Sequence, residues 1–138
     1  MIKRFAHVCL AAVDLAATER FYCDGLGLTK AFDFIRDGRV IGFYLELCPG
    51  EYVEVFQCDD RAAPATGPIL HFCLEVDDLE PVGRRLAEHG YAATPKTLGA
   101  DHSWQMWTTD PNGVKIEFHQ YTARSCQLTH ESCILSLR

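Results

Sequence analysis

One nine-residue pattern occurs twice in this chain. Residues 7–15 read HVCLAAVDL and residues 71–79 read HFCLEVDDL, with the same residue at five positions. Downstream of each copy, a strand-like run carries a central glutamate: YVEVFQ contains Glu54 and VKIEFHQ contains Glu117. The His-to-Glu separations are 47 and 46 residues. Two equivalent units can therefore bring two imidazoles and two carboxylates to one shared cleft, a donor set that suits a divalent metal.

The first half of the chain predicts one helix and four strands in the order βαβββ. The helix is expected over about residues 15–24, because Asp14 is a good N-cap and Gly25 ends the pattern. Asp37 and Gly38 form a typical hairpin turn, and Pro49-Gly50 gives the next turn. The strands are expected over residues 5–10, 29–37, 40–47 and 52–57.

The second half predicts the same order of elements. Asp78 is the expected N-cap of a helix whose apolar residues Leu79, Val82 and Leu86 recur at helical spacing, and Gly90 ends it. The strands are expected over residues 69–76 and near 93–98, 103–109 and 114–120, with a strong turn at residues 110–113.

These patterns predict an α+β fold. Residues 1–138 are expected to form a single domain of two tandem βαβββ modules, whose curved mixed sheets surround a concave cleft. Module one covers residues 3–58 and module two covers residues 69–121. The polar, Pro- and Gly-containing residues 59–68 are the predicted linker, and residues 122–138 form a weakly patterned C-terminal tail.

The composition excludes several classes of function. The formal net charge of −6 argues against nucleic-acid binding, which needs clustered Lys and Arg. The apolar runs are too short for a signal peptide or a membrane span. Seven cysteines, an odd number with no CxxC pair, do not suggest a disulfide framework. We therefore expect a cytoplasmic protein with no membrane partner.

The two histidines and two glutamates can be explained by a shared metal or by separate structural roles. Glu54 and Glu117 interrupt otherwise apolar strands, and an unpaired buried carboxylate is costly unless a metal or another partner offsets its charge. His7 alone is more often a structural or surface residue, and Glu54 alone is often a solvated residue on an open sheet face. The repeat-equivalent occurrence of two His and two Glu favours a bound metal over these separate explanations.

The chain resembles the vicinal oxygen chelate superfamily, which includes glyoxalase I, bleomycin-resistance proteins and extradiol dioxygenases. The resemblance rests on the paired modules, the opening strand with His7, the FYCDGLGL segment at residues 21–28 and the DPNGVKIEF segment at residues 110–118. It covers about residues 3–121. The family implies a small-molecule substrate and, in many members, a homodimer.

The glyoxalase I-like members of this superfamily imply one divalent metal per chain, Ni, Zn, Co, Mn or Fe. Its ligands here would be His7, Glu54, His71 and Glu117, with Glu117 or Glu54 as the catalytic base. Dioxygenases imply only His7, His71 and Glu117, so Glu54 favours a lyase or isomerase; Glu46 is its rival on the preceding strand. Ala11 stands where glutathione-using glyoxalases commonly carry Arg, which leaves the thiol of the substrate open.

Three functions remain open from the sequence. The first is a lactoylglutathione lyase-like enzyme acting on a hemithioacetal or another small chelating carbonyl. The alternatives are an Fe(II) extradiol-type dioxygenase and a non-catalytic ligand-binding or antibiotic-resistance protein. Further candidates for substrate binding are His102, Trp104, Gln105 and His119, although core or dimer packing would also explain the tryptophan and solvation would also explain His119.

Overall fold

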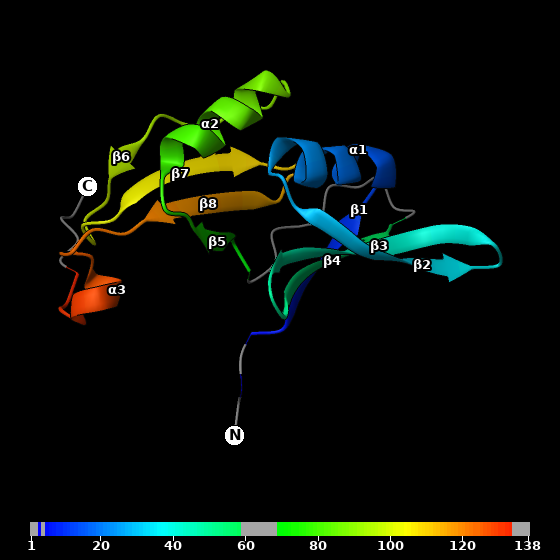
Figure 1. The fold of residues 1–138 in the computed structure, drawn as a ribbon, viewed down its shortest axis with the longest axis horizontal. Helices are drawn as coiled ribbons and strands as arrows, with labels where there is room; N and C mark the ends of the chain where they lie inside the picture. The colour runs from blue at the N-terminus through cyan, green and yellow to red at the C-terminus, as the bar shows by residue number, and fades with distance from the viewer. Residues whose placement is uncertain (1–2, 4, 59–68, 134–138) are drawn as a thin grey trace. The chain divides into compact units, whose positions relative to one another are not determined.

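The computed structural model describes residues 3, 5–58 and 69–133 (Figure 1). The described chain divides into two compact units, and each contains one four-stranded sheet. Unit one holds the described residues up to 58 together with the turn at residues 110–113, and unit two holds residues 69–109 and 114–133. The predicted linker, residues 59–68, lies outside the described residues.

Unit one has the predicted βαβββ order with a mixed sheet. Its sheet order is β1-β4-β3-β2, in which β1 is parallel to β4 and the other pairs are antiparallel. The elements are β1 (His7–Ala12), α1 (Leu15–Arg20), η1 (Phe21–Gly25), β2 (Thr29–Arg36), β3 (Arg39–Cys48) and β4 (Glu51–Gln57).

One face of this sheet forms the core of unit one. Alternation places six apolar side chains on that face: Leu10, Ala12, Phe43, Leu45, Val53 and Val55. The helical segment supplies Phe21 and Tyr22, which are fully buried and meet edge to face with ring centroids 5.0 Å apart. Burying such side chains contributes roughly 1.5–3 kcal/mol each. The opposite face of the sheet is the one that carries His7 and Glu54.

The first helix begins where the sequence predicts but changes type before its end. The Asp14 carboxylate accepts a hydrogen bond from the Ala17 N–H at 2.9 Å and so caps the helix. After Arg20 the backbone continues as the π-helix η1 up to Gly25. The predicted end at Gly25 is confirmed, but the regular α-helix over residues 15–24 is not.

Unit two repeats this architecture with sheet order β5-β8-β7-β6, in which β5 is parallel to β8. Its elements are β5 (Phe72–Glu75), α2 (Leu79–Glu88), β6 (Thr97–Leu98), β7 (Trp104–Thr109), β8 (Lys115–Gln120) and α3 (Cys126–Thr129). In Figure 1, α2 lies along one face of β7 and β8.

Two predicted strands of the second half are shorter than expected. The strand predicted over residues 69–76 is β5, which covers only Phe72–Glu75, so His71 directly precedes it. The strand near residues 93–98 is reduced to β6 and an isolated bridge between Ala93 and Thr108. Pro95 lies between these two points, and a proline has no backbone N–H for the ladder.

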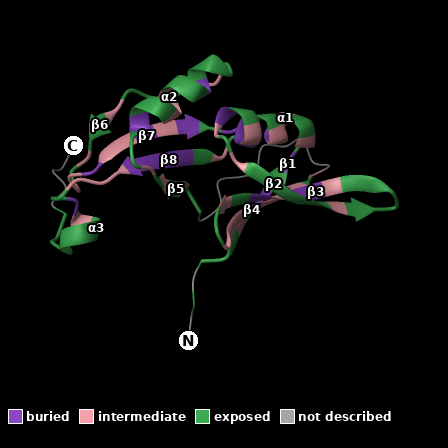
Figure 2. Ribbon diagram, in the orientation of Figure 1, coloured by how far each residue is buried: buried purple, intermediate pink, exposed green. Residues whose placement is uncertain are grey.

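The helix α2 closes the core of unit two as its apolar spacing predicts. Asp78 accepts a hydrogen bond from the Glu80 N–H at 3.1 Å, and Gly90 follows the helix with a φ of +80°. In unit two, Figure 2 shows buried residues on β8 and on parts of β7 and α2. The buried apolar residues are Leu79, Leu86, Met106, Ile116 and Phe118.

The turn at residues 110–113 makes its side-chain hydrogen bonds with unit one. The buried Tyr22 hydroxyl donates to Asp110 Oδ2 at 3.1 Å. The Asn112 side chain accepts from the Val13 N–H at 3.1 Å and donates to Thr18 Oγ1 at 3.0 Å. The turn that joins β7 to β8 is therefore part of the polar interior of unit one.

The described part of the tail packs within unit two. Ser125 is fully buried, and the Ser103 and Ser125 hydroxyls lie 3.0 Å apart. Gln127, in the short helix α3, donates to Asp101 Oδ2 at 2.6 Å. The tail thus supports the loop before β7. No helix in the described ranges is long and apolar enough to cross a membrane.

Candidate functional site

The sheet register places the predicted metal ligands of unit one on the face opposite the core. Cys9 and Tyr44 are both Cα partners of Glu54, and His7 is the partner of Tyr52. These side chains share one face because residues that pair across strands point to the same side. The alternating neighbours Val53 and Val55 are fully buried on the other face.

Within this face, His7 and Glu54 form a pair. His7 Nε2 lies 3.7 Å from Glu54 Oε2, and the Tyr44 hydroxyl lies 3.1 Å from His7 Nδ1. The 3.7 Å separation is too long for a hydrogen bond, so the two groups approach without satisfying each other. Glu46, the rival carboxylate, is exposed and pairs in register with Tyr52. Glu54 is therefore the carboxylate that accompanies His7.

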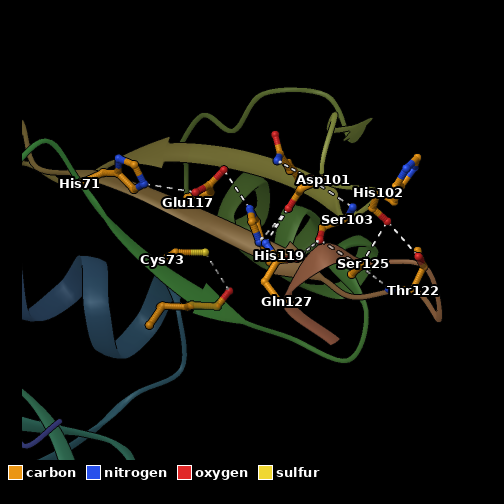
Figure 3. A network of polar contacts seen from close by, with 12 residues as sticks. His71, Cys73, Asp101, His102, Ser103, Glu117, His119, Thr122, Ser125 and Gln127 are labelled. Atoms are coloured by element: carbon orange, nitrogen blue, oxygen red, sulfur yellow. Dashed lines mark hydrogen bonds and ion pairs between the residues drawn. The ribbon is translucent and has the colours of Figure 1, made fainter. Parts of the chain in front are cut away.

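Unit two repeats this pair and adds a second imidazole (Figure 3). His71 Nε2 lies 3.2 Å from Glu117 Oε2, and His119 Nε2 lies 3.0 Å from Glu117 Oε1. Glu117 and His119 are each 8% exposed, whereas the His71 side chain is 37% exposed. A nearly buried carboxylate between two imidazoles is the strongest concentration of metal-binding chemistry among the described residues.

Asp101 forms the outer part of this arrangement. Its carboxylate accepts from Gln127 at 2.6 Å, from the Ser103 N–H at 3.2 Å and from Gln105 at 3.3 Å, and it lies 4.0 Å from His119 Nδ1. Burial disfavours the charged form, but the hydrogen bonds from Gln127 and Ser103 outweigh it and lower the pKa of Asp101. A fixed anion therefore lies beside the His119 ring.

A cysteine accompanies the glutamate in each unit. Burial of the thiol, together with the Glu54 carboxylate, raises the pKa of Cys9 to about 11. Burial and the Glu117 carboxylate raise the pKa of Cys73 to about 12. Both thiols are therefore neutral near pH 7 in the absence of a metal, and both lie on the same sheet face as the His and Glu.

The four candidates for substrate binding are only partly brought together. His119 contacts Glu117, and Gln105 contacts Asp101. The imidazole of His102 points away from Glu117 in Figure 3, and this residue contributes its carbonyl oxygen to Thr122 and Ser125 instead. Trp104 lies one residue from Gln105, so it faces the other side of β7, where the Lys96 ammonium lies 5.1 Å from its ring.

Three residues at this site were not singled out from the sequence. Trp107 meets the His71 ring edge to face at a centroid distance of 4.8 Å. Alternation along β7 puts Trp107 on the same face as Gln105, and the register of β7 against β8 pairs Trp107 with Glu117. Cys73 was considered only as one of seven cysteines that do not suggest a disulfide framework. Asp101 gave no sequence signal, because its position depends on the loop and on Gln127 of the tail.

The residues fit the divalent metal that the sequence predicts. Each unit holds a His–Glu pair at a repeat-equivalent position, with the imidazole Nε2 3.7 Å from the carboxylate in unit one and 3.2 Å from it in unit two. Imidazole nitrogens and carboxylate oxygens are suitable ligands for Zn, Ni, Co, Mn and Fe ions. A cavity of about 500 Å³ elsewhere in unit two is lined by residues 92–94 and 107–109 with Lys115, and contains none of these ligands.

Known proteins are similar to this chain in sequence or in fold. The uncharacterized protein YaeR of Escherichia coli strain K12 is 27% identical over 127 residues, which cover 86% of this chain and 97% of YaeR. The crystal structure of a glyoxalase family protein from Enterococcus faecalis is 25% identical with a TM-score of 0.71, over 85% of this chain and 97% of that one.

A third similar structure is TnmS3, an antibiotic binding protein from Streptomyces sp. CB03234. It is 18% identical with a TM-score of 0.70, over 88% of this chain and 98% of that one, so it shows the shared fold alone. A sequence model of the Glyoxalase/Bleomycin resistance protein/Dioxygenase superfamily matches residues 4–118. With the duplicated modules and their His–Glu pairs, this match shows that the chain belongs to the glyoxalase/bleomycin resistance/dioxygenase superfamily, also called the vicinal oxygen chelate superfamily.

Proposed function

We propose that this protein is a divalent-metal-dependent, glyoxalase I-like lyase or isomerase. Its substrate would be a small chelating carbonyl compound or a thiol hemithioacetal, as in a lactoylglutathione lyase. The observation that carries this proposal is the second His–Glu pair: Glu54 accompanies His7 as Glu117 accompanies His71. A dioxygenase-type triad of His7, His71 and Glu117 would not need Glu54.

His7, Glu54, His71 and Glu117 would hold one divalent metal per chain. When bound, the metal would act as a Lewis acid that polarises two substrate oxygens and stabilises the negative charge of an enediolate. The donor set suits Ni²⁺, Zn²⁺, Co²⁺, Mn²⁺ and Fe²⁺ alike. The identity of the metal therefore has to come from measurement of the purified protein.

A glutamate of this set would move the proton between adjacent substrate carbons. Glu117 is our first choice as the base, because it is nearly buried and has an imidazole beside each carboxylate oxygen. Such neighbours orient the carboxylate and exclude water from it, which favours general base catalysis. Glu54, which is more open and has one imidazole beside it, is the alternative base.

The thiol part of the substrate is a separate question. Ala11, on β1, occupies the position where a glutathione-using enzyme of this type commonly has an arginine. An alanine methyl group cannot donate to the carboxylates of glutathione. We therefore expect weak activity with the glutathione adduct.

The test combines metal analysis with an activity assay. We expect about one divalent metal per chain in protein purified without chelator, and a clear loss of metal in His71→Ala, measured by mass spectrometry. The metal-loaded protein should isomerise the hemithioacetal of methylglyoxal with at least one of several thiols. Oxygen consumption with a catechol, without isomerisation of any adduct, would replace this proposal by the extradiol-type dioxygenase.

An aromatic surface in unit one supports ligand binding without chemistry as a second candidate function. The Phe32 and Tyr44 rings stack at 4.7 Å, the Phe34 and Phe56 rings stack at 4.6 Å, and Phe32 is 48% exposed. Open aromatic faces of this kind suit planar ligands. Tight binding of a planar aromatic antibiotic by metal-free protein, lost in Phe32→Ala, would favour this function over the lyase.

A further inference from the structure

We propose that unit two contains a metal site of its own for a thiophilic divalent cation of the zinc class. Its ligands are Cys73 Sγ, Glu117 Oε1 and His119 Nε2. It shares Glu117 with the catalytic site proposed above but uses neither His7 nor Glu54. The inference therefore stands on the contacts within unit two and does not depend on the proposed enzymatic activity.

The fold brings these three ligands together through the strand register. Cys73 on β5 is the Cα partner of Glu117 on β8, and His119 lies two residues further along the same face of β8. The three ligand atoms all lie within 4.8 Å of one another. Zinc bonds of about 2.0–2.3 Å would require small side-chain rotations, chiefly of the Cys73 thiol, and no rearrangement of the strands.

The His119 ring gives the evidence that points to a ligand. Its Nε2 atom is buried and makes no hydrogen bond within the described residues, although it lies only 3.0 Å from Glu117 Oε1. The nitrogen is therefore close to the carboxylate without being directed along a hydrogen bond to it. Neighbouring ligands of one metal at about 2.1 Å lie roughly 3.0–3.4 Å apart. The pair thus has the separation of two ligands of a common ion.

The Glu117 carboxylate has one oxygen for each site. Oε2 faces His71 at 3.2 Å, and Oε1 faces His119 at 3.0 Å (Figure 3). Oε2 is therefore available to a metal that His71 also binds, while Oε1 belongs to the site with Cys73 and His119. A carboxylate can serve both because its two oxygens together offer about four lone pairs.

Asp101 completes the site from outside. Metal-binding histidines usually have a carboxylate, a backbone carbonyl or a water beside the ring nitrogen that does not bind the metal. Asp101 lies 4.0 Å from His119 Nδ1, on the side away from Nε2, and Gln127 and Ser103 hold it in place. The loop and tail that sequence patterns left unexplained thus support His119.

Unit one provides an internal comparison. Cys9 and Glu54 are the repeat equivalents of Cys73 and Glu117, and they are also Cα partners in parallel strands. Phe56 stands where unit two has His119. Only unit two thus has the third ligand, so Cys9→Ser is a matched control for Cys73→Ser. The thiolate ligand selects zinc and cobalt over magnesium and calcium, which prefer oxygen.

The test uses Co²⁺ as a spectroscopic probe of the whole 138-residue chain. A bound thiolate gives cobalt a near-ultraviolet charge-transfer band, which oxygen and nitrogen ligands do not produce. We expect this band in the wild type, its loss in Cys73→Ser and its retention in Cys9→Ser. We expect Asp101→Asn to retain the band but to bind cobalt about 10–100-fold more weakly. Circular dichroism of each variant would show whether it is folded.

Other outcomes would overturn the site. A wild type with no thiolate band, or a band that survives in Cys73→Ser, would exclude Cys73 as a ligand. A band that disappears equally in Cys9→Ser would remove the distinction between the units. His7→Ala, which disables the catalytic site, should keep the band; its loss there would show that the thiolate site is not confined to unit two. If Cys73→Ser does not fold, zinc affinity can be measured in His119→Gln by competition with a chromophoric chelator. Weaker zinc binding by His119→Gln than by the wild type would support the site, and equal binding would exclude it.

Discussion

Two glutamates that are equivalent in the sequence differ in their surroundings. Glu117 is 8% exposed and has His71 and His119 within 3.2 Å of its oxygens, whereas Glu54 is more open and its nearest imidazole is 3.7 Å away. A carboxylate that is held from both sides is the better oriented base. The pseudo-symmetry of the sequence is therefore broken at the level of single residues.

This difference predicts unequal effects of two matched substitutions. We expect Glu117→Gln to lower the isomerisation rate by about 10²–10⁴-fold, the usual loss when a general base is removed. Glu54→Gln should act mainly through weaker metal binding, so that added metal restores part of its activity. Steady-state rates of both variants over a metal titration would check this. Equal rates for both variants at saturating metal would contradict the assignment of Glu117 as the base.

The thiol of Cys9 gives a prediction about pH. Because burial and Glu54 raise its pKa from 9.0 to about 11, the thiol stays protonated below that pH. At pH 8 its thiolate fraction is about 100-fold smaller than that of an ordinary thiol, and alkylation should be slower in proportion. Peptide mass spectrometry after timed iodoacetamide treatment measures this rate.

Removal of the neighbouring charge supplies the control. Glu54→Gln should lower the pKa of Cys9 and speed its alkylation at pH 8, while the burial contribution remains. A Cys9 that reacts at the same rate in both proteins would show that the carboxylate does not act on the thiol.

At the scale of the elements, the sequence predicted the helix caps, turns and strand order that depend on neighbouring residues. The caps at Asp14 and Asp78, the hairpin at Asp37-Gly38 and the repeated strand order all follow from short-range rules, and the structure confirms them. Asp37 and Gly38 have φ angles of +50° and +72°, as a tight hairpin turn requires.

The parts that were missed depend on contacts between distant segments. Asp101 joins the site through Gln127, 26 residues further along the chain, and no periodicity reports such a contact. The position of Trp107 opposite Glu117 required the register of β7 against β8. The π-helical turn at η1 has no reliable pattern in a single sequence. The sequence repeat was enough to predict the candidate ligands, but it did not predict the residues that support them.

The cap of α2 predicts a local change in stability. Asp78→Ala removes the acceptor of the Glu80 N–H and should lower the free energy of unfolding by about 0.5–2 kcal/mol. Asp77→Ala removes the same charge from the neighbouring exposed position and is the matched control. Urea titration followed by circular dichroism should show a lower midpoint only for Asp78→Ala. Equal shifts of the midpoint in both variants would show that the lost charge, and not the lost cap, causes the effect.

At the scale of the whole molecule, we predict a homodimer. Members of this family often build their clefts from modules of two chains, and one chain here has two modules. Sedimentation velocity at micromolar concentration should show a species of twice 15.5 kDa. A 15.5 kDa species alone would rule the dimer out at that concentration.

The turn at residues 110–113 should contribute to the stability of the fold, although a turn between two strands would not suggest this from the sequence. Asn112→Ala removes the hydrogen bonds to Val13 and Thr18, so we expect a loss of about 1–3 kcal/mol in the free energy of unfolding. Pro111→Ala, at an exposed neighbouring position, serves as the control. Chemical denaturation of both variants is the measurement, and an unchanged midpoint for Asn112→Ala would contradict the role given to this turn.

The same turn makes the first half of the chain depend on the second. The buried Tyr22 hydroxyl donates to Asp110, which comes from the second half of the sequence. A first module cut from the rest of the chain would leave this hydroxyl without its acceptor, at a cost of about 1–3 kcal/mol. Because the second half supplies part of the polar interior of the first, we expect the first module to be less stable alone than within the whole chain.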